Sequence, residues 1–276
     1  MQLAARMLGV ASATFLLFAS AGEVLASDRE KLEALSNGDH RAEGNADRNR
    51  YRHPAETLGF FGLEPDMTVV ELSPGGGWYT EIIAPYVAGA GHYVAAGVDL
   101  NSGNPRARAS AERFKAKLDA HPDLYGDEYE MVPMEPGTDW VEPGTADMVL
   151  TFRSVHGWMG RGTAEAVFAD AYRALKPGGI LGVVEHRAPE GAPLDPEARS
   201  GYVPESHAVA LAEAAGFRLA AKSEINANPK DPADWEGGVW TLPPTLRYGD
   251  ENRDRYMAIG ESDRFTLKFI KPGEGQ

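Results

Sequence analysis

The chain of 276 residues contains no cysteine, which excludes disulfide bonds, thiolate nucleophiles and cysteine-ligated metal sites. It also lacks any dense run of lysine or arginine, and its formal net charge is −14. Phosphate backbones are bound by clustered basic side chains, so we expect no nucleic-acid partner. An anionic membrane surface is disfavoured as a partner for the same reason.

The N-terminus has the pattern of a secretory signal. Arg6 precedes an apolar stretch from Val10 to Phe18, and the small residue Ala26 comes just before polar residues begin. The apolar stretch is too short to span a bilayer comfortably. We therefore expect residues 1–26 to be a cleaved signal peptide and the mature chain to be periplasmic or secreted, without stable membrane insertion. A retained N-terminal anchor is the alternative.

The rest of the chain is expected to form one domain. With 43% hydrophobic residues it can bury one substantial core, and two independent full-size domains would be a tight fit. Residues 27–53 are polar and predict an N-terminal extension, a helix and a loop on the surface. Residues 54–276 carry a regular pattern, interrupted at about 226–262 by an insertion rich in proline, glycine and aspartate. This insertion is expected to cover a substrate, or else to wrap the domain.

Strand and helix patterns alternate along the domain. Seven segments rich in β-branched and apolar residues predict strands at Thr68–Leu72, Tyr93–Ala96, Tyr129–Met134, Ala146–Phe152, Ile180–Glu185, Phe217–Ile225 and Arg264–Ile270. Helical spacing is found at Ala55–Phe61, Trp78–Val87, Ala107–Ala120, Thr163–Leu175 and Pro204–Ala215. The alternation predicts an α/β fold with a mainly parallel sheet, covered by helices on both faces. Ligands of such sheets bind at the carboxyl ends of the strands.

A glycine-rich bend follows the first predicted strand, with the sequence Glu71-Leu72-Ser73-Pro74-Gly75-Gly76-Gly77-Trp78. Glycines let the backbone approach a ligand closely, and the start of the next helix offers free N–H groups. A dinucleotide fingerprint requires a third glycine where Thr80 stands, which weakens an NAD or FAD interpretation. No Gly-Lys-Ser/Thr follows, which disfavours a P-loop.

The acidic strand end followed by a Gly-x-Gly bend resembles motif I of the class I S-adenosylmethionine (SAM) dependent methyltransferases. Later features also resemble that family, namely Ala146–Leu150 with its Asp147, the turn Leu175–Gly179, and Ala214–Phe217. The resemblance runs from about 54 to 273. It implies a Rossmann-like seven-stranded methyltransferase sheet with an antiparallel C-terminal strand, SAM as the cofactor, and methyltransferase activity. Arg52-His53-Pro54 and Asp263-Arg264-Phe265 more narrowly resemble a group of predicted, often exported bacterial methyltransferases.

The resemblance also implies which residues contact the cofactor. The bend would hold the methionine part of SAM through Glu71, Ser73, Gly75, Gly77 and Trp78. An acid at the end of the second strand normally holds the ribose hydroxyls in this family. That place falls near Gly97, and the nearest acid is Asp99, so either the strand is longer or the contact is lost. Glu135, after the third strand, is the candidate beside the adenine.

Methyl transfer needs little covalent help from a protein, so positioning of the acceptor supplies most of the acceleration. Histidine is the usual base near neutral pH when a hydroxyl or amine must lose its proton. His156 follows the fourth strand and His186 the fifth, and these strands are neighbours in the family topology. We expect His156, His186 and Arg153 to act as base or positioning residues for a small-molecule substrate; the alternative is that each histidine caps a loop. Trp158 is expected in a pocket lid.

Two other functions fit the same pattern. A non-catalytic module that binds SAM or another nucleoside is favoured by export, because SAM is made in the cytoplasm. A metal-dependent enzyme on the same fold would use His53 and His207 together with the two histidines above. No His-x-x-x-His spacing is present, so a bound metal is not predicted. The sequence indicates neither the methyl acceptor nor the oligomeric state.

Overall fold

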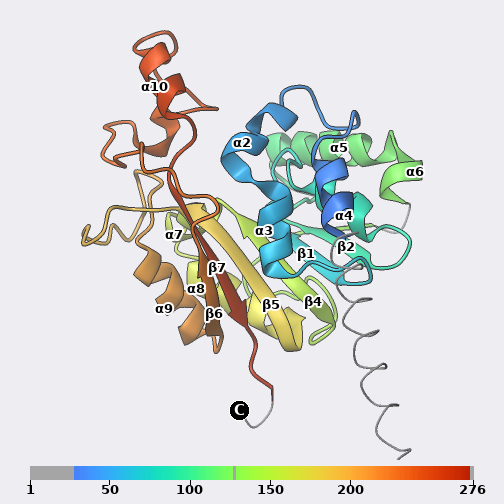
Figure 1. Cartoon of the computed structure of the whole chain (residues 1–276). Coiled ribbons are helices and arrows are strands. Elements are labelled where there is room, and N and C mark those ends of the chain that lie inside the picture. Colours follow the sequence, from blue (N-terminus) through green and yellow to red (C-terminus); the bar gives the residue numbers. More distant parts are fainter. Residues whose placement is uncertain (1–27, 127–128, 274–276) are drawn as a thin grey trace, which may run out of the picture.

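The computed structural model describes residues 28–126 and 129–273. At its centre is a seven-stranded sheet in the order β3-β2-β1-β4-β5-β7-β6 (Figure 1). The strands are β1 (Thr68–Leu72), β2 (His92–Ala96), β3 (Glu130–Val132), β4 (Ala146–Phe152), β5 (Leu175–His186), β6 (Arg218–Ser223) and β7 (Arg264–Ile270). The first five are parallel, and β7 runs antiparallel between β5 and β6. The predicted Rossmann-like fold with an antiparallel C-terminal strand is confirmed.

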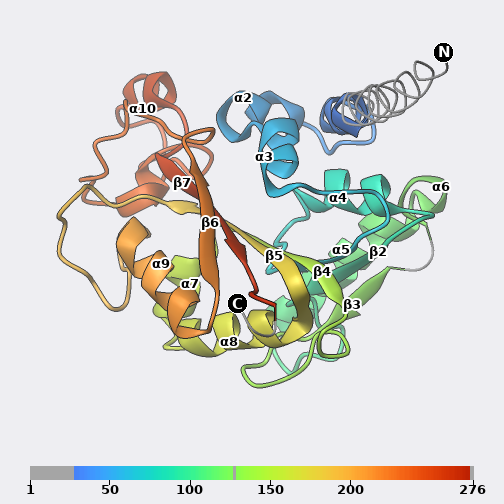
Figure 2. The same ribbon diagram turned by 60° about the horizontal axis from the view of Figure 1, so that its bottom comes forward.

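Helices cover both faces of the sheet. The α-helices are α2 (Asn49–Arg52), α3 (Pro54–Phe61), α4 (Thr80–Val87), α5 (Pro105–Asp119), α6 (Pro122–Tyr125), α7 (Val155–Met159), α8 (Ala164–Ala174), α9 (Glu205–Ala214) and α10 (Arg253–Ile259), with short 3-10 turns at η1 (Ala46–Arg48) and η2 (Gly238–Thr241). Figure 2 shows α3, α4 and α5 on one face and α7, α8 and α9 on the other. Successive strand residues point to opposite faces, so Val69 packs in one core and Val70 in the other. None of the helices in the described part of the chain is long and apolar enough to span a membrane.

The fifth strand begins earlier than predicted, at Leu175 rather than Ile180. The Lys-Pro-Gly-Gly stop signal does end α8, but the chain then joins the sheet immediately. Leu175 pairs with Ala146, and the register shifts before the next pair. Gly178 has a φ of 83°, which lets the strand accommodate this irregularity. The residues predicted to form a turn instead form an irregular start to β5, because β4 lies beside them and pairs with Leu175.

Residues 28–53 form a helix and a loop that lie mostly at the surface, but four of their side chains, those of Leu32, Ser36, Arg41 and Arg52, are buried. Residues 28–36 are helical, and Leu32 is 2% exposed. Arg41 Nε donates to Glu81 Oε2 of α4 at 2.8 Å, with both side chains buried. Arg52 in α2 is buried as well. The polar extension therefore combines a mostly exposed surface with a few buried arginines that pair with distant carboxylates. The predicted signal peptide, residues 1–26, lies outside the described residues.

The insertion at 226–262 packs at the end of the sheet where α2 lies (Figure 1). It contains η2 and α10 and has a small core of Leu242, Leu246 and Tyr256. Asp231 anchors it by accepting hydrogen bonds from Tyr202 Oη at 2.8 Å and Trp235 Nε1 at 2.8 Å. The insertion is therefore held in place beside the carboxyl ends of the strands.

Candidate active site

The bend after β1 has the conformation that a close backbone approach requires. Ser73, Gly75 and Gly77 have φ values of 52°, 61° and 80°, in the left-handed region that favours glycine. Lys117 of α5 donates to the Gly76 carbonyl at 2.7 Å and fixes the bend from the outside. A Cβ built on Gly75 would meet no atom within 4 Å, so one side of the bend is open.

Two cavities adjoin at this bend, and both contain Ser73 and Gly75 in their lining. The first cavity has a volume of about 340 Å³ and reaches Glu71, Trp78 and Arg153. The second has a volume of about 440 Å³ and extends along the ends of β2 and β3. Both volumes are in the range of small-molecule sites. The bend therefore lies between two spaces that can accept the two halves of one ligand.

Most of the predicted cofactor residues line these cavities. Glu71, Ser73, Gly75 and Trp78 line the first. Gly77 lines neither cavity. A Cβ built there would meet the side chains of Phe114 and Thr80 at 3.3 and 3.4 Å, so this glycine faces the protein interior. Gly77 therefore serves the packing of the bend against α5 and α4.

Asp99 and Glu135 both line the second cavity. The sequence left open whether β2 runs on to Asp99 or the contact is lost. The strand ends at Ala96, yet the N–H groups of Gly97 and Val98 still donate to the Val132 carbonyl, at 2.8 and 3.2 Å. This short extension of the pairing brings Asp99 to the cavity. Its Oδ1 accepts the backbone N–H of Asn101 at 2.8 Å, which orients the carboxylate.

Glu71 is buried in the sheet beneath the first cavity, and its carboxylate accepts two hydroxyl donors. Tyr93 Oη donates at 2.6 Å and Thr80 Oγ1 at 2.8 Å. Burial raises the pKa of Glu71 to about 7, although both hydroxyls lower it. Thr80 stands where a dinucleotide fingerprint would have its third glycine, and its hydroxyl instead holds the Glu71 carboxylate in place.

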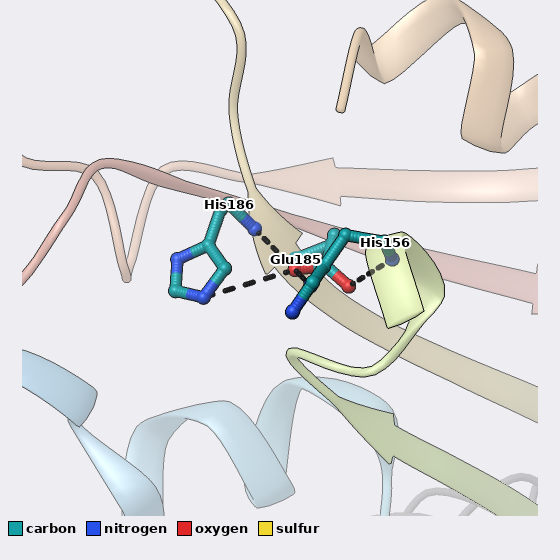
Figure 3. A group of neighbouring side chains, drawn as sticks. All are labelled: His156, Glu185 and His186. Atoms are coloured by element: carbon teal, nitrogen blue, oxygen red, sulfur yellow. Dashed lines mark hydrogen bonds and ion pairs between the residues drawn. The ribbon is translucent and has the colours of Figure 1, made fainter. Parts of the chain in front are cut away.

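A third cavity of about 180 Å³ lies at the ends of β4 and β5, and it shares Arg153 with the first. His156 and His186 line it, and the carboxylate of the buried Glu185 lies between them (Figure 3). The backbone N–H groups of His156 and His186 donate to the Glu185 carboxylate at 3.3 and 2.8 Å. His156 Nδ1 lies 3.1 Å from Glu185 Oε1. The structure therefore brings the two predicted histidines and Arg153 to one cavity.

The two histidines differ in electrostatic environment. Burial lowers the pKa of His156, but the Glu185 carboxylate outweighs it, so the pKa is raised overall. Burial, and next the charge of Arg153, hold the pKa of His186 well below its ordinary value. His186 Nδ1 forms a short hydrogen bond with Ser262 Oγ. Both histidines line the third cavity, but the Glu185 carboxylate orients His156 and raises its pKa, whereas Ser262 holds His186 and burial lowers its pKa.

Within the described part of the chain, only His156, Glu185 and His186 form a group that could hold a metal ion, with ligand atoms within 4.8 Å of one another. His53 and His207 do not join them, so the considered four-histidine cluster does not form. Arg153 and Arg264 line the same cavity, and their charge disfavours a bound cation.

Four arginines gather beside the first and third cavities, and sequence reasoning anticipated only Arg153. Arg48, Arg52 and Arg264 all bind the buried carboxylate of Glu261, in the insertion. The motifs Arg52-His53-Pro54 and Asp263-Arg264-Phe265 contain two of these arginines. Their spacing in the chain gave no sign that they meet.

Trp158, expected in a lid, is buried in α7 and packs edge-on against Phe168 of α8, with ring centroids 6.3 Å apart. The lid interpretation is therefore wrong. The segment after His156 is a short helix that closes a core, because its apolar residues Val155, Trp158 and Met159 face α8. The wall of the third cavity comes instead from the insertion, through Val239 and Trp240.

No family model and no curated protein matches this sequence. Solved structures do match. A SAM-dependent methyltransferase from Aquifex aeolicus is 16% identical, with a TM-score of 0.55 over 88% of this chain and 98% of the other. The [4+2]-cyclase SpnF is 14% identical, with a TM-score of 0.57 over 86% and 85%. Phosphoethanolamine N-methyltransferase 2 of Haemonchus contortus, in complex with SAM, is 15% identical, with a TM-score of 0.52 over 81% of this chain and 53% of the other.

Similarity at this level of identity establishes a shared architecture, and the cyclase shows that one architecture hosts different reactions. The strand order, the antiparallel β7 and the ligand-sized cavities at the glycine bend agree with it. This chain therefore has the fold of the class I SAM-dependent methyltransferases.

Proposed function

We propose that this chain is a SAM-dependent methyltransferase that acts on a small molecule. The observation that carries the proposal is the pair of cavities that adjoin at Ser73 and Gly75. The methionine part of SAM would lie in the first cavity near Glu71, and the adenosine part in the second, between Asp99 and Glu135. When bound, SAM supplies an activated methyl group on a sulfonium.

The protein's own contribution is to hold the acceptor and to take its proton. His156 faces the third cavity, and that cavity adjoins the first through Arg153. Glu185 orients the imidazole through Nδ1, which leaves Nε2 for the acceptor. We assign His156 as the base, Glu185 as its positioning residue, and Arg153 as a contact of the acceptor. Because residues 1–26 are predicted to be a signal peptide, the proposal includes methyl transfer outside the cytoplasm.

Replacing Gly75 by valine is expected to weaken SAM binding by a factor of about 100 or more, because the side chain enters the space where the ligand would lie. Strain at positive φ also destabilises the folded protein, by about 1–3 kcal/mol. Isothermal titration calorimetry of the purified protein with SAM and with S-adenosylhomocysteine measures the effect. Gly144→Val is the matched control, since Gly144 has a φ of 75°, has open space around its Cβ position and precedes the opposite end of β4.

Equal losses of SAM affinity in Gly75→Val and Gly144→Val would indicate that backbone strain alone is responsible. The bend would then not be the cofactor site. Absence of SAM and S-adenosylhomocysteine binding by the wild-type protein would remove the proposed function altogether. Binding of both without transfer to any acceptor would favour a non-catalytic module.

Asp99→Asn tests the second cavity, which is proposed to hold the adenosine part of SAM. A carboxylate that accepts ribose hydroxyls makes charge-assisted hydrogen bonds, so the exchange is expected to weaken SAM binding by roughly 10- to 100-fold. Asparagine still offers Oδ1 to the Asn101 N–H, so the local turn is kept. Asp195→Asn is the control, because Asp195 caps a comparable exposed turn through the N–H groups of Glu197 and Arg199. A change of less than twofold in Asp99→Asn would place the ribose elsewhere.

A further inference from the structure

Four guanidinium groups meet at the boundary between the first and third cavities, and we call Arg48, Arg52, Arg153 and Arg264 the arginine cluster. Arg52 and Arg153 line the first cavity, and Arg153 and Arg264 line the third. The Glu261 carboxylate accepts from Arg48 Nε at 2.6 Å, from Arg52 Nε at 3.0 Å and from Arg264. Three arginines therefore share one carboxylate, whereas the buried Nε of Arg153 has no hydrogen-bond partner among the described residues.

Several N–H donors of the arginine cluster have no hydrogen-bond partner in the described structure. Arg48 Nη2, Arg52 Nη2, Arg153 Nε and Arg264 Nε are buried without a hydrogen-bond partner in the described structure. Arg52 and Arg264 are almost fully buried, with side chains 1% and 2% exposed. Buried donors are ordinarily partnered, and native proteins leave few of them free. Burial, and next the charge of Arg264, lower the pKa of Arg153 to about 10, so its charge persists at neutral pH in an unfavourable setting.

The local charge selects the kind of ligand. Two carboxylates, Glu261 and Glu185, lie among four guanidinium groups, and His156 beside them has a raised pKa. A cation would be repelled from this place, whereas an anion would be attracted. Carboxylate and phosphate groups also match the fork of N–H donors that a guanidinium presents.

We propose that the methyl acceptor is an anionic small molecule whose carboxylate or phosphate group binds Arg153 and Arg264 in the third cavity, beside His156. The identity of this ligand as an acceptor rests on the proposed function, whereas the anion site stands on the geometry. A cavity of about 180 Å³ is large enough for the anionic part of a metabolite. Trp240, with its ring 6.0 Å from that of His156, forms the wall contributed by the insertion.

The carboxylate of SAM is a second anion that could bind the arginine cluster, because it would reach Arg52 and Arg153 through the first cavity. Inorganic phosphate separates the two sources. We expect phosphate, titrated by calorimetry at low ionic strength, to bind the full-length purified protein once per chain. Binding should be unchanged when S-adenosylhomocysteine, which carries the same carboxylate, is saturating.

Arg153→Asn is expected to weaken phosphate binding at least tenfold. Asparagine is chosen because it tolerates the left-handed backbone at this position, where φ is 59°. Arg218→Asn is the control, since it removes the same charge from an exposed position on β6, at the far end of the sheet. Arg264→Lys, which keeps the charge but loses the guanidinium fork, provides a second variant and should also weaken binding. Circular dichroism confirms that each variant is folded.

Absence of phosphate binding in the wild-type protein would overturn the inference. Displacement of phosphate by S-adenosylhomocysteine would overturn it too, because the arginine cluster would then serve the cofactor. The same holds if Arg153→Asn and Arg264→Lys bind phosphate as the wild type does. A failure of SAM binding is a different result: it overturns the proposed function, and with it the identity of the anion as a methyl acceptor.

Discussion

Replacing Glu261 by glutamine is expected to destabilise the protein by about 3–5 kcal/mol, because removing one partner of a buried ion pair leaves the other charges uncompensated. Glu261 is 2% exposed and is the shared acceptor for Arg48, Arg52 and Arg264. Glutamine keeps the shape and one acceptor oxygen, so packing changes little. Urea unfolding followed by circular dichroism measures the loss.

Glu197→Gln is the matched control. Glu197 also pairs with an arginine, Arg199 at 2.9 Å, but both side chains are well exposed. Exposed pairs contribute little, so its free energy of unfolding should stay within about 0.5 kcal/mol of the wild type. A loss below about 1 kcal/mol in Glu261→Gln would contradict the importance of this buried carboxylate.

Lowering the pH should affect the stability of the wild type and of Glu261→Gln differently. Burial would raise the pKa of Glu261, but the arginines, with Arg264 first, outweigh it and hold the pKa far below its ordinary value. A depressed pKa contributes stability that is present above the unfolded value, about 4.3, and is lost as the pH falls towards the folded value. The wild type should therefore lose stability below about pH 4.3 more steeply than Glu261→Gln.

The sheet could be predicted from the sequence because its strands are set by local pattern. Thr68–Leu72, Ala146–Phe152 and Arg264–Ile270 begin and end where the runs of apolar and β-branched residues do. These runs are buried on one or both faces, and nothing remote is needed to define them. The glycine bend was visible for a similar reason, since its conformation is encoded by adjacent glycines.

The arginine cluster was not predictable in the same way. Its members come from the N-terminal extension, the end of β4 and the start of β7, and their shared carboxylate lies in the insertion. A chain without a basic run can thus assemble a strongly basic site in space. Composition reported the net charge of −14 correctly, but it carries no information on which charges meet. The burial of Arg41 and Arg52 within the polar segment 28–53 was not predictable for the same reason, because it depends on distant partners.

The position of Asp99 is an intermediate case. Its presence near the end of β2 was visible, but whether it reached a ligand depended on backbone geometry beyond the strand. Gly97, with a φ of 101°, turns the chain so that Asp99 faces the second cavity. Sequence pattern located the residue, and only a tertiary structure located its side chain.

His156→Gln is expected to lower kcat by about 10²–10⁴-fold for an acceptor that must lose a proton, while SAM binding stays within about twofold of the wild type. The reason is that His156 faces the third cavity and lies outside the lining of the two cavities assigned to SAM. Production of S-adenosylhomocysteine measures the rate, and calorimetry measures the binding. An equal loss of SAM affinity and rate would mean that His156 holds the cofactor instead.

The pH dependence gives the sharper test, because it depends on the Glu185–His156 pair and not on the acceptor's identity. A base must be neutral, so kcat/KM falls as the pH drops below the pKa of His156, which the Glu185 carboxylate holds above its ordinary value. Glu185→Gln removes that carboxylate and should move the acidic limb to lower pH. His186→Gln should leave the limb in place, since burial already holds the pKa of His186 well below this range. A limb that follows His186→Gln and ignores Glu185→Gln would exchange the roles of the two histidines.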